Sequence, residues 1–274
     1  MIRKIFHLCV LIVSLCQSIS VVHAVSFEED ISLSTNQAEI LTKFRQRVLP
    51  MLPKKYMEEN IYLIRWLRAR NFNMDRAEEM LRQHLKWRSD NQLDQIDDEE
   101  WQDFETDYPL NKKGLDKNGR PLVQILFGEW DLRKAAVTGR TDRLIRWIYK
   151  YFEDATKLVR KYQADGKNVT QFTLIMDADG FSTISHACPL CMRVYFAISN
   201  IYEEHYPGSV DKIHIVNTPE PFRVIVRLLW PLLSQNTRQA INMMGTNRRE
   251  WQSQLTKNVK TDQLLPSFGG TLYQ

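Results

Sequence analysis

The stretch RPLVQILFG (residues 120–128) carries the clearest strand pattern in this chain. Its apolar run, 122–127, is short, rich in branched residues and bounded by proline and glycine, as is typical of a buried strand. Similar runs follow at Gln171–Met176 and Lys212–Val216, and a long helical pattern at Thr141–Tyr162 separates the first two. Because parallel neighbours need a crossover of that length, the alternation predicts an α/β fold with a mainly parallel sheet.

The alternation continues toward the C-terminus. Helices are predicted at residues 189–205 and 221–233, and a fourth strand at Ala240–Met244. On the long helix, apolar side chains recur at helical spacing and are expected to face the core. They are Leu144, Ile145, Ile148, Phe152, Ala155 and Val159.

Residues 34–92 have a purely helical pattern, with Asn73 as the predicted N-cap of one helix. The acidic connector Asp97–Glu100 is interpreted as a solvated linker or a helix start. The pattern then changes to strand and helix. The sequence therefore predicts a helical module at 25–102 and an α/β domain at 103–274.

Residues 1–24 have the features of a secretory signal peptide. Arg3 and Lys4 form a basic start, Ile5–Ile19 is apolar, and small residues end at Ala24. Cleavage there would leave Val25 as the mature N-terminus and lower the net charge from +4 to +2. The alternatives are an uncleaved anchor or an artefact upstream of the true start. We therefore expect a secreted or luminal protein, or a cytoplasmic one if the leader is not functional.

Two cysteines remain after such cleavage, Cys188 and Cys191. Their spacing fits a redox motif, half a zinc site or a short disulfide, but two incidental thiols are the favoured interpretation. No second cysteine pair is present to complete a zinc site. Asn168 begins an N-V-T sequon, which predicts N-glycosylation in a secreted protein.

Composition and motifs exclude several classes of function. The 274 residues are 43% hydrophobic and 26% charged, a globular balance, and the net charge of +4 does not indicate nucleic acid binding. No G-x-S-x-G, P-loop, G-x-G-x-x-G or H-E-x-x-H motif is present. Asp177 and Asp179 resemble the start of a calcium loop, but Cys188 stands where the closing Glu belongs, which favours a strand-closing turn. We expect no enzyme, no metal and no cofactor.

The predicted helix 221–233 is apolar around nearly its whole circumference, interrupted only by Arg223 and Arg227. A surface helix normally has one apolar stripe. Two interpretations remain: a central core helix, or a lid that covers an apolar cavity and contacts membranes when open.

Eight short motifs resemble, in order, those of the CRAL-TRIO lipid-transfer family. They are residues 64–72 (IRWLRARNF), 85–88 (LKWR), 116–121 (DKNGRP), 176–180 (MDADG), 206–207 (YP), 217–219 (NTP), 265–266 (LP) and 268–270 (FGG). The resemblance spans about residues 33–270, nearly the whole mature chain.

The resemblance implies a helical module beside a lipid-binding α/β domain, whose sheet floors an apolar pocket closed by a gate helix at 221–236. It implies non-enzymatic binding and transfer of one hydrophobic lipid by a monomer that contacts membrane surfaces transiently. The bound lipid is then the only ligand expected. Side chains expected to line the pocket are Leu126, Phe172, Leu174, Met176, Tyr195, Phe222, Val226 and Trp230.

Two charged positions that family members use for inositol phosphate are replaced here by Gly208 and Ala240, whereas Thr237 is retained. Phosphatidylcholine binders carry hydroxyls where this chain has Phe172 and Leu174. Because a buried phosphate without partners is strongly disfavoured, we expect a weakly polar head, as in a tocopherol, retinoid, carotenoid or sterol. The alternatives are a phosphatidylinositol or other phospholipid transfer protein and a secreted interaction protein that reuses the fold. Arginines that could aid docking to anionic membranes are Arg65, Arg68, Arg70, Arg223 and Arg227.

Overall fold

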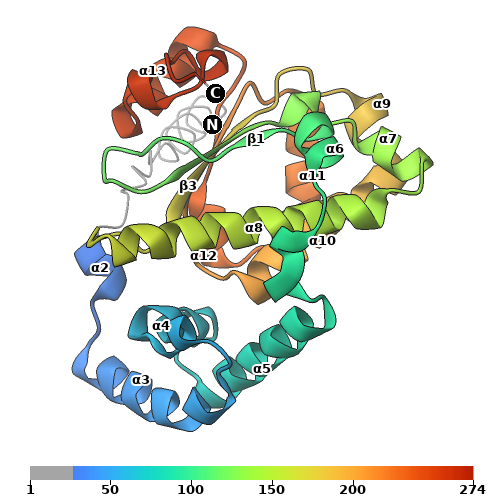
Figure 1. Cartoon of the computed structure of the whole chain (residues 1–274). Coiled ribbons are helices and arrows are strands. Elements are labelled where there is room, and N and C mark those ends of the chain that lie inside the picture. The colour runs from blue at the N-terminus through green and yellow to red at the C-terminus, as the bar shows by residue number, and fades with distance from the viewer. Residues whose placement is uncertain (1–26, 274) are drawn as a thin grey trace, which may run out of the picture.

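A computed structural model of the chain describes residues 27–273; the predicted signal peptide, 1–24, and its cleavage site lie outside them. The N-terminal part of the described chain is a helical module that lies beside the α/β part (Figure 1). The module contains α2 (Phe27–Ile31), α3 (Thr35–Val48), α4 (Asn60–Ala69) and α5 (Met74–Asp90). The predicted helical stretch is therefore confirmed.

Local capping explains where these helices begin. Ser34 and Gln37 form a capping box at α3. The Asn73 side chain accepts a hydrogen bond from the Arg76 backbone N–H (3.0 Å), so its predicted N-cap role at α5 is confirmed. The apolar faces of α3, α4 and α5 form one core of their own. It contains Leu41, Phe44, Val48, Leu63, Ile64, Trp66, Leu67, Ala77, Met80 and Leu81.

The sheet has the strand order β1-β2-β3-β4-β5. The strands are β1 (Leu110–Asn111), β2 (Leu122–Leu126), β3 (Phe172–Asp177), β4 (Val210–Val216) and β5 (Ile241–Met243). The β2–β5 pairs are parallel, and only β1 joins antiparallel to β2. The predicted α/β fold with a mainly parallel sheet is confirmed. The sequence missed β1, because two residues are too few to show a period.

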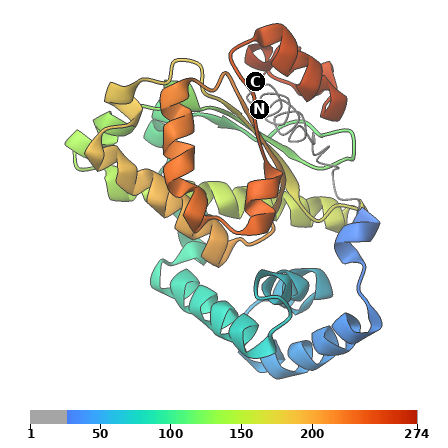
Figure 2. The same ribbon diagram turned by 180° about the vertical axis from the view of Figure 1, so that it is seen from behind.

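Helices cover both faces of this sheet. On one side lie α8 (Thr141–Ala164), α10 (Met192–His205) and α11 (Glu220–Leu229), and on the other α13 (Arg248–Asn258). Figure 2 shows α11 next to α10, with α13 across the sheet from them. Shorter helices connect these layers: α6 (Gln102–Asp107), α7 (Leu132–Val137), α9 (Thr183–His186) and α12 (Gln235–Ala240). All six α8 residues that were predicted to face the core are buried.

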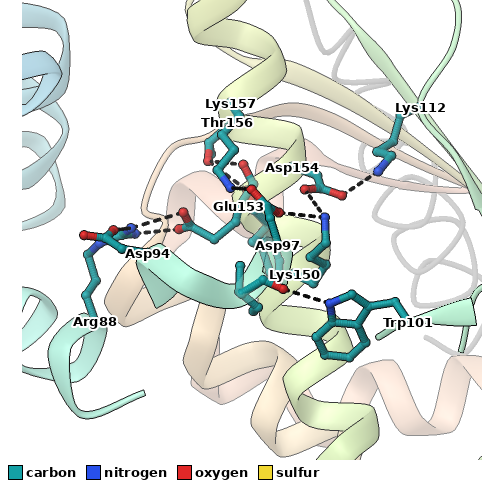
Figure 3. A network of polar contacts seen from close by, with 12 residues as sticks. Arg88, Asp94, Asp97, Trp101, Lys112, Lys150, Glu153, Asp154, Thr156 and Lys157 are labelled. Carbon is teal, nitrogen blue, oxygen red and sulfur yellow. Dashed lines mark hydrogen bonds and ion pairs between the residues drawn. The ribbon is translucent and has the colours of Figure 1, made fainter. Parts of the chain in front are cut away.

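The acidic connector is mostly exposed, as expected of a solvated linker, but ion pairs also tie it to α8. Asp97, in the 3-10 helix η3 (Leu93–Asp98), pairs with Lys150 of α8 at 2.9 Å. Glu99 accepts a hydrogen bond from Arg146 of the same helix at 2.7 Å. Partial burial raises the pKa of the Glu99 carboxyl, but the arginine hydrogen bonds outweigh it and hold its pKa below the ordinary value. Figure 3 shows Asp97 of the connector in contact with Lys150 and Lys157 of α8.

Candidate functional site

The helix α11 carries apolar side chains on both its buried and its exposed sides. Its buried residues are Phe222, Ile225, Val226 and Leu229. On the opposite side Val224 is 45% exposed and Leu228 is 59% exposed. A central core helix is therefore excluded, and α11 forms an outer wall of the α/β part.

Seven of the eight residues predicted to line the pocket fall in one apolar cluster, to which α11 itself contributes Phe222 and Val226. They belong to one apolar cluster or pack against it: Phe172, Leu174, Met176, Tyr195, Phe222, Val226 and Trp230. Phe127 lies among them and was not predicted. Its ring centroid is 6.0 Å from that of Tyr195 and 6.0 Å from that of Phe222.

The eighth residue, Leu126, was assigned to the wrong face of the sheet. It packs against the cluster of Ile175 and Trp251 beneath α13. Side chains alternate along a strand, so Leu126 cannot share a face with Ile125, which belongs to the cluster beneath α11. Phe127, the next residue along the chain, lies in the cluster next to α11, where Leu126 was predicted to lie.

Two buried polar atoms flank Phe127 without a hydrogen-bond partner among residues 27–273. They are the hydroxyl of Tyr195 and Nε2 of His186. The two side chains are 6% and 2% exposed, respectively. The His186 ring centroid is 5.7 Å from that of Phe127, and its Nδ1 faces Ser182. Burial raises the pKa of Tyr195, which keeps its hydroxyl protonated. Sequence offers no signal for His186, because it reaches the core only through the turn of α9.

A second region contains the three positions that correspond to inositol-phosphate contacts in other family members. They are Gly208, Thr237 and Ala240, and they line a cavity of about 540 Å³. Lys212 of β4 also lines it. Gly208 adopts a left-handed conformation with φ 64°, which a glutamate at this position would adopt only with strain. None of the seven residues packed beneath α11 lines this cavity.

The five arginines predicted to dock on membranes fall into two groups. Arg65, Arg68 and Arg70 line the 540 Å³ cavity. Arg68 donates to Asp30 at 2.8 Å and Arg70 to Glu204 at 2.7 Å, so both are ion-paired. Arg223 and Arg227 lie on α11 instead: Arg223 donates to the Thr218 carbonyl, and Arg227 pairs with Glu220.

Cys188 and Cys191 form a disulfide with a Cα–Cα distance of 5.0 Å, in the turn before α10. The interpretation as two incidental thiols is therefore wrong. Asn168 is exposed in the loop that follows α8. Its glycosylation remains a prediction.

The described residues contain no arrangement that suggests catalysis at a metal. No group of three or more His, Cys, Asp or Glu side chains within residues 27–273 could hold a metal ion. Asp177 Oδ1 accepts hydrogen bonds from the Asp179 backbone and the Asn217 side chain, as expected of a strand-closing turn. In the same part of the chain, no helix is long and apolar enough to span a bilayer.

Comparison with known proteins identifies the family. A profile of the CRAL/TRIO domain matches residues 106–270, and the chain belongs to the CRAL-TRIO family, whose members bind and transfer lipophilic ligands. It is 27% identical to Protein real-time of Aedes aegypti over 216 residues, which cover 78% of this chain and 33% of that protein. It is 26% identical to CRAL-TRIO domain-containing protein T23G5.2 of Caenorhabditis elegans over 224 residues, 79% of this chain and 30% of that protein. The chain thus spans about a third of these relatives.

A likeness in fold extends beyond the domain itself. The crystal structure of Sfh5 superposes with a TM-score of 0.69 at 14% identity, covering 88% of this chain and 89% of Sfh5. At this identity the likeness establishes the fold alone. It includes the helical module, because the match covers more of the chain than the domain profile does.

Proposed function

We propose that this chain carries one largely apolar lipid with a weakly polar head beneath α11 and exchanges it with membranes. The observation that carries the proposal is the pair of unpartnered polar atoms on either side of Phe127, Tyr195 Oη and His186 Nε2, among mostly apolar side chains. Buried polar groups nearly always have a hydrogen-bond partner. The hydroxyl of a tocopherol, retinoid or sterol can both donate and accept, and so suits these two atoms.

The position of α11 supports exchange with a bilayer. Moving a lipid chain from a bilayer into water costs about 0.8 kcal/mol per CH₂, and an apolar protein interior removes that cost. Because protein interior and bilayer are both apolar, loading and release are nearly balanced. The exposed Val224 and Leu228 give α11 an apolar outer side that a membrane can accept when the helix opens.

Native mass spectrometry with organic extraction tests the proposal, using mature chain secreted from eukaryotic cells. We expect one co-purified apolar species without phosphorus. The double variant Tyr195→Phe/His186→Phe should retain the fold and lose most of this ligand. A chain that takes up no lipid, even after loading, would contradict the proposal.

A phospholipid with an acidic head is the second candidate, and the 540 Å³ cavity favours it. This cavity combines Thr237 with basic side chains that include Arg70 and Lys212. Phosphorus in the extract, with phosphatidylinositol transfer between liposomes that Lys212→Met reduces, would support this candidate over the first. We also propose residence in the secretory lumen or outside the cell, which the leader-like N-terminus and the Cys188–Cys191 disulfide support.

A further inference from the structure

A cavity of about 810 Å³ lies between the helical module and α8. Figure 1 shows α4 beside α8, with α2 at the C-terminal end of α8. Aliphatic side chains from both parts line the cavity, among them Leu41, Ile61, Ile64 and Val159. None of the seven predicted pocket residues lines it, and Val159 is the residue named here that it shares with their cluster. The cavity is therefore distinct from the region of the proposed lipid.

The charged side chains of this cavity are mostly cations. Arg65, Arg160 and Lys167 line it, against the single carboxylate of Glu59. Arg65 and Arg160 form no salt bridge within residues 27–273, whereas the neighbouring Arg68 and Arg70 do. Arg65 also borders the 540 Å³ cavity.

The two arginines lie in surroundings that favour an anion. The Arg160 guanidinium lies over the Tyr56 ring at 4.2 Å, which fixes it at the cavity wall. Burial lowers the pKa of Arg65; Asp30 opposes this effect, and the positive charge of Arg160 adds to it. A guanidinium nevertheless stays protonated in proteins. A partly buried positive group with no ion-pair partner is stabilised by an incoming carboxylate.

We propose that this cavity is a second binding site, for a single-chain fatty acid. Its carboxylate would accept hydrogen bonds from Arg65 and Arg160, and its alkyl chain would lie along Leu41, Ile61 and Ile64. The volume lies within the range of small-ligand sites, about 300–1,000 Å³. The aliphatic wall disfavours a free phosphate, and the two guanidinium groups disfavour a neutral lipid.

Titration of the purified mature chain with [1-¹³C]dodecanoate, followed by carboxyl ¹³C NMR and calorimetry, tests the site. We expect Arg65→Met and Arg160→Met each to weaken binding about tenfold or more. Arg70 follows the end of α4 and does not line the cavity, so Arg70→Met, which removes an equal charge, should change binding less than about twofold. Dodecanol should bind at least about tenfold more weakly than dodecanoate.

Further variants separate this site from the proposed lipid region and from a folding defect. Ala164 is exposed and lines the cavity, so Ala164→Trp should block dodecanoate without disturbing the core. Trp230→Glu, in the turn that follows α11, should leave dodecanoate binding unchanged. Equal binding of dodecanol and dodecanoate would overturn the proposal, as would Arg65→Met and Ala164→Trp both binding like the wild type. Loss of binding in Trp230→Glu alone would also overturn it, by placing the fatty acid beneath α11.

Discussion

Arg88 and Glu153 form a buried ion pair that joins α5 to α8. Arg88 donates to both carboxylate oxygens of Glu153, at 2.5 and 3.2 Å, and the Tyr206 hydroxyl donates to the same carboxylate at 2.6 Å. Burial alone would lower the pKa of Arg88, but Glu153 outweighs burial and raises it. The pair lies at the junction of the helical module and the α/β part (Figure 3).

Replacing one partner of this ion pair should lower the free energy of unfolding more than replacing both partners. Glu153→Gln leaves the buried guanidinium with only the part-exposed carboxylate of Asp94 as counter-charge, and we expect a loss of about 3 kcal/mol in the free energy of unfolding. The double variant Arg88→Met/Glu153→Met should lose clearly less, because no unpaired charge remains. Urea denaturation of both variants measures the difference. Equal losses would show that the carboxylate matters mainly through Tyr206.

Three histidines are held neutral in the fold. Burial lowers the pKa of His205 and of His214 to about 4, and places that of His84 well below the ordinary value. Below pH 6.5 the unfolded chain binds protons that the folded chain does not, so stability falls as pH falls from about 6.5 to about 4. Each fully buried histidine contributes at most about 1.4 kcal/mol per pH unit. Above pH 6.5 this contribution is constant.

The variant His205→Phe tests the pH dependence directly. His205 stacks on Trp87 with ring centroids 3.8 Å apart, so phenylalanine preserves the stack and removes one titrating group. We expect a shallower loss of stability between pH 6.5 and 4, measured by urea denaturation. An unchanged slope would assign the dependence to His84 and His214.

At the scale of elements, the proposed function makes different predictions for the two sides of α11. Leu228 points outward, whereas Trp230 in the following turn packs against the core. Leu228→Glu should slow transfer between liposomes about tenfold and leave retention unchanged, because burying a leucine contributes about 1.5–3 kcal/mol. Trp230→Glu should instead weaken retention.

Leu49→Glu serves as the matched control, since Leu49 is an exposed leucine in the helical module, 41% accessible. Transfer by this variant should equal that of the wild type. If Leu49→Glu slows transfer as much as Leu228→Glu does, added negative charge rather than α11 accounts for the effect.

Elements with several turns or several alternating residues could be predicted from the sequence. The long α8 and strands β2 to β4 have enough residues to show their period, and each was placed within about two residues. The strand β1 could not be predicted, because two residues show no period. The face of Leu126 could not be predicted reliably, because a shift of one residue along a strand moves a side chain to the other face of the sheet. The role of the acidic connector was missed because its partners lie on α8, distant in sequence.

The candidate site could be predicted only in part, for the same reason. The residues of the cluster next to α11 were expected from the family resemblance and from their positions along the chain. The 810 Å³ cavity lies between α4 and α8, which are separated by many residues, and no local pattern links Arg65 to Arg160. His186 and Phe127 were likewise brought together only by the fold.

At the scale of the whole molecule, the leader and the sequon make one joint prediction. Expressed in eukaryotic cells, the chain should be secreted beginning at Val25, with one N-glycan on the exposed Asn168. N-terminal sequencing and glycosidase treatment of the medium measure both features. The variant Asn168→Gln should be secreted too, but glycosidase treatment should leave its mass unchanged. Retention of the full chain inside the cell would contradict the proposed location.

The strand order has a consequence for biosynthesis. Each strand pairs with its neighbour in sequence, so the sheet can grow one strand at a time as the chain leaves the ribosome. The side covered by α13 is an exception. Leu122, Ile175 and Val216 stay uncovered until residues 248–268 have been synthesised. Chains that stop before that segment expose an aliphatic sheet face, and chaperones and quality control will encounter them as aggregation-prone species.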